Sequence, residues 1–259
     1  MANKAKELLK EGKLSLGGWE SLNNAAAGEV MARAGFDWVA CDIEHGTHSV
    51  QDYAYFATAV RSQGSVPLAR IFDKSMLSIR RILDAGALGI IVPMIRTAQD
   101  AREVVSAASF PPRGVRGAGA GAYSCSGVDL GEAVASAHDD VLIMVMIETK
   151  EAVENIEEIM SVEGIDGIFL GPFDLSCSYG VNGQITHPIV SEAMVKVVDV
   201  CRKHNKAAGM HVLPNDEKIL KDAIEKGFTF LALSYDSNLI YQGSRSMIET
   251  ANKAAASLA

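Results

Sequence analysis

Short apolar runs and longer helical segments alternate along the whole sequence, and this alternation decides the fold class. Each apolar run has the length of a strand buried on both faces, and turn residues separate it from the next segment. The expected strands are Leu14–Trp19, Phe36–Asp42, Val66–Ile71, Leu88–Met94, Val141–Ile147, Ile165–Leu170, Ala207–Val212 and Phe228–Ser234. Parallel strands need crossover connections, so the alternation predicts a parallel α/β sheet.

The expected helices complete eight strand–helix units. They are Ser21–Ala34, Val50–Ser62, Lys74–Ala85, Thr97–Ala108, Thr149–Met160, His187–Asn205, Asp216–Lys226 and Asn238–Ser257, with a short additional helix over Val128–Ala137. Eight units in 259 residues without a linker predict one domain, a (β/α)8 barrel over residues 1–259. A doubly wound sheet is the alternative, but no GxGxxG follows the first strand, and GAGAG at 117–121 follows no clear strand.

One connection, Phe110–Ser126, is rich in glycine and other small residues and is too long for an ordinary link. Long loops in compact domains often carry function, so this segment is expected to be functional. A disordered loop tip is the alternative.

Composition limits the partners of the chain. A net charge of −8 argues against non-specific binding to nucleic acid or to an anionic membrane, because both need a basic face. No apolar run approaches the ~20 residues that span a bilayer, and the start of the chain lacks the apolar core of a signal peptide. The four cysteines, Cys41, Cys125, Cys177 and Cys201, form no CxxC motif and are typical of reduced cytosolic thiols. These features favour a cytoplasmic protein acting on small molecules.

Polar side chains gather where the expected strands end, which is where (β/α)8 barrels carry their chemistry. The residues at or just beyond these ends include Trp19, Asp42, Glu44, His45, His48, Arg70, Glu148, Asp174 and His211. An apolar strand that stops on Glu148 places a carboxylate at the rim of a core, which is costly unless the carboxylate is paired or binds a metal. Their convergence on one face predicts an active site there.

The segment Ile165–Ser176 holds the most informative of these ends. A buried strand breaks at Gly171-Pro172, Asp174 follows at once, and a helix is expected to open near Leu175. Backbone N–H groups at such a helix start bind anions. Glu148 and Asp174 lie on adjacent strands, so the two carboxylates can share a hard cation such as Mg²⁺ or Mn²⁺. The alternatives are a helix cap for Asp174 and a surface ion pair for the two acids.

The sequence indicates specific roles or positions for four further residues. His45 suits a proton carrier because imidazole titrates near physiological pH, whereas His48 is expected at the surface, at a helix start. Arg70 can hold a substrate carboxylate or an oxyanion, or it can simply neutralise the neighbouring acids. Asp84 opposes the helix dipole in a last helical turn, which hints at a role such as orienting a histidine.

Six motifs, taken together, resemble the HpcH/HpaI family of metal-dependent class II pyruvate aldolases. They are CDIEHGTHS, PLARI, LDAGALGIIVPM, PPRGVRG, IETKEAVENI and GIDGIFLGPFDLS, in this order, and the resemblance runs from about Gly17 to Ser234. The family includes 4-hydroxy-2-oxoheptanedioate and 2-dehydro-3-deoxyglucarate aldolases. It implies a (β/α)8 barrel that reversibly splits a 4-hydroxy-2-oxo acid into pyruvate, or a related 2-oxo acid, and an aldehyde.

The resemblance also implies roles for individual residues. By position, His45 corresponds to the catalytic base, Asp84 to the acid that raises its basicity, and Arg70 to the transition-state stabiliser. Glu148 and Asp174 correspond to the ligands of a divalent cation, Mg²⁺, Mn²⁺ or Co²⁺. The expected substrate contacts are Trp19, Gly171, Pro172, Phe173 and Asp174. A homo-oligomer, commonly a hexamer, is implied as well, with the last helix packed on a neighbouring subunit.

One position departs from the family pattern, and three other functions stay open. Many members carry a glutamine two residues before the metal-binding glutamate, but this chain has Met146, whose thioether donates no hydrogen bond. A Schiff-base aldolase needs a lysine at a strand end, and both Lys74 and Lys206 lie elsewhere. The others are a lyase that acts on an acyl-CoA thioester and a barrel that binds a metal–oxoacid complex without turnover.

Overall fold

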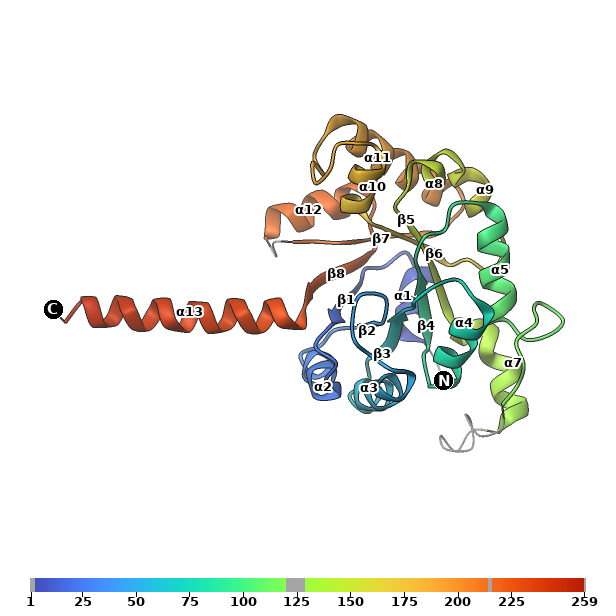
Figure 1. Cartoon of the computed structure of the whole chain (residues 1–259), viewed down its shortest axis with the longest axis horizontal. Coiled ribbons are helices and arrows are strands. Elements are labelled where there is room, and N and C mark those ends of the chain that lie inside the picture. The colour runs from blue at the N-terminus through green and yellow to red at the C-terminus, as the bar shows by residue number, and fades with distance from the viewer. Residues whose placement is uncertain (1–2, 120–128, 214–215, 259) are drawn as a thin grey trace.

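The computed structural model describes residues 3–119, 129–213 and 216–258 of the chain. Eight parallel strands close into one barrel in chain order, with β1 paired to both β2 and β8 (Figure 1). The strands are β1 Ser15–Glu20, β2 Trp38–Asp42, β3 Val66–Arg70, β4 Gly89–Val92, β5 Leu142–Ile147, β6 Gly167–Leu170, β7 Ala207–His211 and β8 Phe230–Tyr235. The predicted (β/α)8 barrel is confirmed.

Helices surround this barrel and connect its strands (Figure 1). Within the described residues they are α1 Lys4–Lys10, α2 Ala25–Arg33, α3 Val50–Ser62, α4 Met76–Asp84, α5 Ala98–Ala108, α7 Leu130–Asp140, α8 Lys150–Glu154, α9 Ile156–Met160, α10 Pro172–Ser178, α11 Pro188–Lys203, α12 Glu217–Lys226 and α13 Asp236–Ala256. None of the described helices is both long and apolar enough to cross a bilayer.

Several expected helices differ from those observed: the helix predicted from Ser21 begins at Ala25, and the one expected to open near Leu175 begins at Pro172. The helix predicted over Thr149–Met160 is two helices, because the chain breaks at Asn155, whose side chain donates to the Arg96 carbonyl at 2.9 Å. The helix predicted over Val128–Ala137 is α7, which starts after its cap at Asp129 and continues to Asp140. Residue 128, like residues 120–126 of the glycine-rich loop, lies outside the described residues.

Aromatic side chains fill the interior of the barrel. Trp38 of β2 stacks on Phe230 of β8 with ring centroids 4.2 Å apart, and Phe169 of β6 meets Phe230 edge to face at 6.2 Å. Gly17 of β1 leaves space for the Trp38 ring, which any Cβ at this position would overlap. A second apolar layer lies between the outer surface of the barrel and the surrounding helices.

Helix α1 packs across the amino-terminal end of the barrel. The ammonium group of Lys6 donates to the carbonyls of His138 and Val141 at 3.1 and 2.7 Å, and it lies 3.1 Å from the Asp166 carboxylate. These partners lie in or next to the segments that enter β5 and β6, so α1 covers the end of the barrel opposite the predicted active site.

Helix α13 leaves the barrel as a single extended helix (Figure 1). At its root, Asp236 is buried and accepts hydrogen bonds from the backbone and hydroxyl of Ser21 at 3.1 and 2.7 Å. From Leu239 onward, each described residue is exposed.

Candidate active site

Arg70, at the carboxyl end of β3, is held by neighbours on both sides. Its Nε and one terminal nitrogen donate to the two carboxylate oxygens of Asp42 at 2.9 and 2.6 Å, and its Nε lies 3.4 Å from Glu44. The guanidinium also lies over the ring of Trp19, 5.1 Å from its centroid. Bidentate pairing of this kind fixes the plane as well as the position of the group.

Electrostatics keep this guanidinium charged. Burial lowers the pKa of Arg70, but the hydrogen bonds and charge of Asp42, together with Glu44, raise it further, so the net shift is upward. Arg70 is therefore a permanent, oriented positive charge at the barrel mouth.

Glu148 follows β5 directly and is buried. One carboxylate oxygen accepts from the backbone N–H of Met94 at 2.7 Å. Burial raises the pKa of Glu148, the nearby Asp174 carboxylate adds to the shift, and the charges of Arg70 and His45 oppose it. Asp174, Arg70 and His45 therefore all lie near enough to act on the Glu148 carboxylate.

The turn between β6 and α10 lies close against Glu148. A Cβ on Gly171 would lie 3.2 Å from a Glu148 carboxylate oxygen, closer than side chains normally approach, so glycine lets the backbone of the turn lie beside this carboxylate. Asp174 lies in the first turn of α10, whose start has no side-chain cap. The carboxylates of Glu148 and Asp174 offer oxygen ligands, and these fit a hard divalent cation.

His45 lies in the loop between β2 and α3, with its side chain 68% exposed. Its Nε2 is 3.7 Å from a Glu44 carboxylate oxygen, and its backbone N–H donates to Asp42 at 3.3 Å. The ring is thus free to meet a substrate at the rim, while the backbone beneath it is fixed.

Within one chain, Asp84 does not lie near His45. It ends α4, immediately before the segment that enters β4, and so lies at the amino-terminal end of the barrel. Its carboxylate pairs with the buried Arg116 at 2.9 Å, and Arg116 in turn lies over the Phe110 ring. His45 follows β2 at the opposite end.

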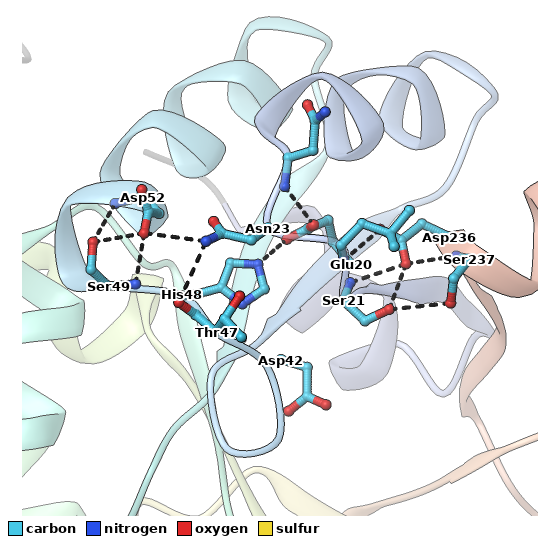
Figure 2. A network of polar contacts seen from close by, with 12 residues as sticks. Glu20, Ser21, Asn23, Asp42, Thr47, His48, Ser49, Asp52, Asp236 and Ser237 are labelled. Atoms are coloured by element: carbon cyan, nitrogen blue, oxygen red, sulfur yellow. Dashed lines mark hydrogen bonds and ion pairs between the residues drawn. The ribbon is translucent and has the colours of Figure 1, made fainter.

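His48 is not the surface residue expected from the sequence. It is buried, and its Nε2 lies 2.7 Å from a carboxylate oxygen of Glu20, the last residue of β1 (Figure 2). Glu20 was missed altogether, because the first strand was expected to end at Trp19. The available signal was the residue itself, a charged side chain at the end of an apolar strand.

Two other residues line the same end of the barrel. His211, at the end of β7, has a pKa lowered to about 4 by burial and by the charge of Arg70, so its ring is neutral. Met146 is buried beside Phe169, its partner on β6, and offers the site a thioether.

The lysines considered for Schiff-base chemistry lie away from this mouth. Lys74 pairs with Asp100 and Glu103 on α5. Lys206 precedes β7, at the amino-terminal end of the barrel, and donates to the Val162 carbonyl at 2.6 Å. The barrel mouth instead combines a fixed guanidinium, two carboxylates and a rim imidazole, a set of groups that suits metal-assisted carbon–carbon lyase chemistry.

Comparisons with known proteins agree with this class. The HpcH/HpaI aldolase/citrate lyase family matches residues 16–242. The 4-hydroxy-2-oxo-heptane-1,7-dioate aldolase of Salmonella dublin is 35% identical over 248 residues, covering 95% of this chain and 94% of that protein. The HpcH/HpaI aldolase structure from Desulfitobacterium hafniense DCB-2 matches with a TM-score of 0.89 at 30% identity, over 96% of each chain. The citrate synthase SbnG gives a TM-score of 0.87 at 26% identity, over 97% of this chain and 98% of that one.

The chain therefore belongs to the HpcH/HpaI aldolase/citrate lyase family, as its motifs indicated. It is an aldolase-type carbon–carbon lyase.

Proposed function

We propose that the chain reversibly cleaves a 4-hydroxy-2-oxo acid into pyruvate, or a related 2-oxo acid, and an aldehyde, with a divalent cation as cofactor. The observation that carries this proposal is that oriented Arg70 and buried Glu148 act on each other across one mouth. Cleavage leaves a 2-oxo acid enolate, an anion that needs both a fixed positive charge and a cation. Relatives named as 4-hydroxy-2-oxo-heptane-1,7-dioate aldolases support the substrate class.

Glu148 and Asp174 would hold the cation, which we propose to be Mg²⁺, Mn²⁺ or Co²⁺. A cation bound there supplies Lewis-acid stabilisation of the enolate. The donor set is two carboxylates with no sulfur, which suits these hard or borderline ions.

The remaining roles belong to side chains and backbone at the mouth. Arg70 places positive charge where the oxyanion develops, and Asp42 keeps its plane fixed. His45 takes the proton of the C4 hydroxyl, directly or through a water, because its exposed ring projects from an anchored loop.

Substrate binding is assigned to the start of α10 and to the aromatic floor. The backbone N–H groups of Phe173 and Asp174 receive the 2-oxo acid carboxylate, since no side chain caps this helix start. Gly171 and Pro172 shape the approach, and Trp19 lies beneath the Arg70 guanidinium.

The test is pyruvate release from a panel of 4-hydroxy-2-oxo acids, with and without added metal. We expect turnover only with metal and no borohydride-trapped adduct with pyruvate. A lysine adduct would replace this proposal with Schiff-base chemistry. Failure to release a 2-oxo acid from any member of the panel would favour a binding protein.

We further propose that the protein is a homo-oligomer, a hexamer, in which α13 packs on a neighbouring copy. Its exposed apolar residues include Leu239, Ile240, Tyr241, Met247 and Ile248. A lone helix with apolar side chains in water gains most of its stability from packing, and within the described residues this helix touches its own barrel only near its root. Light scattering at micromolar concentration should give an oligomer, and Met247→Glu/Ile248→Glu should shift it toward smaller species.

Assembly also offers a role for Asp84. Because it lies at the opposite end of the barrel from its own His45, we propose that it serves His45 of a neighbouring copy. Activity per chain should then fall as the Met247→Glu/Ile248→Glu protein dissociates. A dissociated variant with full activity per chain would contradict this role of Asp84, and a monomeric wild type would contradict the assembly.

A further inference from the structure

A buried ion pair links the end of β1 to the loop between β2 and α3. The Glu20 and His48 side chains are 0% and 1% exposed, and His48 Nε2 lies 2.7 Å from one Glu20 oxygen. The other Glu20 oxygen accepts from the backbone N–H of Asn24 at 2.9 Å, next to α2. Figure 2 shows the pair in a polar network that extends to Ser21 and Asp236 at the root of α13.

The contact between Glu20 and His48 is a hydrogen bond. The ligand atoms of Glu20, Cys41 and His48 lie within 4.8 Å of one another, as in a metal site. Burial lowers the pKa of His48, but its hydrogen bond with Glu20 raises it further, so the imidazole is protonated more readily than usual. Burial, then the charge of Glu20, raises the pKa of the Cys41 thiol. The separation of 2.7 Å between His48 Nε2 and the Glu20 oxygen is a hydrogen-bond length.

The His48 ring lies directly against the loop that carries His45. A Cβ on Gly46 would lie 2.5 Å from His48 Nδ1 and would overlap the Asp42 carbonyl oxygen. Residue 46 is therefore enclosed between the end of β2 and the His48 ring, and a shift of that ring toward Gly46 would displace the loop backbone.

The loop is also restrained elsewhere. Before Gly46, the His45 N–H is held by the Asp42 carboxylate at 3.3 Å. After it, the Thr47 carbonyl accepts from the Asn23 side chain at 3.4 Å, a long contact at the surface. The buried contacts of His48 with Glu20 and with the Asp42 backbone therefore restrain this far side of the loop.

We propose that Glu20 and His48 form a positioning pair, which holds the 43–49 loop so that His45 stays over the barrel mouth. Its catalytic part rests on the proposed function. A buried ion pair is a weak source of stability, because desolvation of the two charges offsets their attraction. Fixing the geometry of a loop at the active site is a role that such a pair can fill.

The test replaces both partners at once, in Glu20→Leu/His48→Leu. Removing both charges leaves no unpaired ion in the core, and the freed Asn24 N–H lies at an exposed residue that water can reach. We expect the melting temperature to stay close to that of the wild type and amide hydrogen exchange in residues 43–49 to rise. We expect kcat to fall on the order of 10²-fold, with a smaller change in KM, because the loop no longer holds His45 in place.

Two variants accompany the double replacement. Lys6→Met/Asp166→Asn breaks a comparable ion pair at the other end of the barrel, and it should leave both kcat and exchange in the 43–49 loop unchanged. His48→Gln keeps a donor for Glu20, and it should retain more activity and more protection than the double leucine variant. If the double leucine variant does not fold, His48→Gln against the wild type decides the same question.

The outcomes separate this inference from the proposed function. Unchanged exchange in the 43–49 loop would overturn the positioning role whatever the activity. Faster exchange with unchanged kcat would break its link to catalysis. If the wild type releases no 2-oxo acid, the proposed function fails, while loop exchange still decides the restraint. Purified protein that carries one zinc per chain and loses it in Cys41→Ser would overturn the inference too.

Discussion

Removal of divalent cations with a chelator is expected to reduce pyruvate release to background, and Mg²⁺, Mn²⁺ or Co²⁺ should restore it. Glu148 and Asp174 are the only protein ligands proposed, so the cation keeps open positions and exchanges readily. Activity assayed before and after each addition measures the effect. A demetallated sample with full activity would remove the metal from the proposal.

Glu148→Gln tests the same site without a chelator. The amide still accepts the Met94 N–H, but the charge that binds the cation is gone. We expect metal binding, measured by calorimetry, and activity to be lost together. Because burial raises the pKa of Glu148, its ionised form opposes folding at neutral pH, and the metal-free variant should melt no lower than the metal-free wild type. Glu157→Gln, at the surface on α9, should change neither activity nor metal binding.

His45→Ala is expected to lower kcat by roughly 10²–10⁴-fold, the usual contribution of general acid–base catalysis. The cation should remain bound, because His45 is not a proposed ligand. Steady-state kinetics together with metal titration separate the two effects. His204→Ala removes another histidine paired with a glutamate, on the outer helices, and should leave kcat unchanged.

Near-normal kcat in His45→Ala with metal bound would make His45 a structural rim residue. The proton of the C4 hydroxyl would then have to pass to a different group, and the mechanism would be wrong at its central step.

The barrel and the convergence at its mouth could be predicted because both follow from local pattern. Apolar runs of strand length specify the sheet, and the rule that parallel strands end at one edge places Arg70 and Glu148 together without any coordinates. Their contact with Asp42 and Met94 was not predictable, because it depends on the tilt and register of neighbouring strands.

The positions of His48 and Asp84 in the fold could not be predicted from their positions in the sequence. His48 precedes a helix, where a polar residue is usually exposed, but the loop folds back and turns its ring toward Glu20, 28 residues earlier. Asp84 was expected to serve a histidine, but alternation of strands and helices places the end of α4 at the opposite face. Sequence spacing alone does not reveal how a loop folds back, nor which end of the barrel a helix end occupies.

Because β1 pairs with β8, the barrel can close only when synthesis of the chain is nearly complete. Ser21 and its partner Asp236 are 215 residues apart, so the first loop lacks its final contacts until nearly the whole chain has been translated. At about 5–20 residues per second, that interval is roughly 10–40 s. During it, one edge of β1 has no partner strand, which is a state prone to mispairing. Nascent chains of this protein are therefore most exposed to aggregation just before the eighth strand emerges from the ribosome.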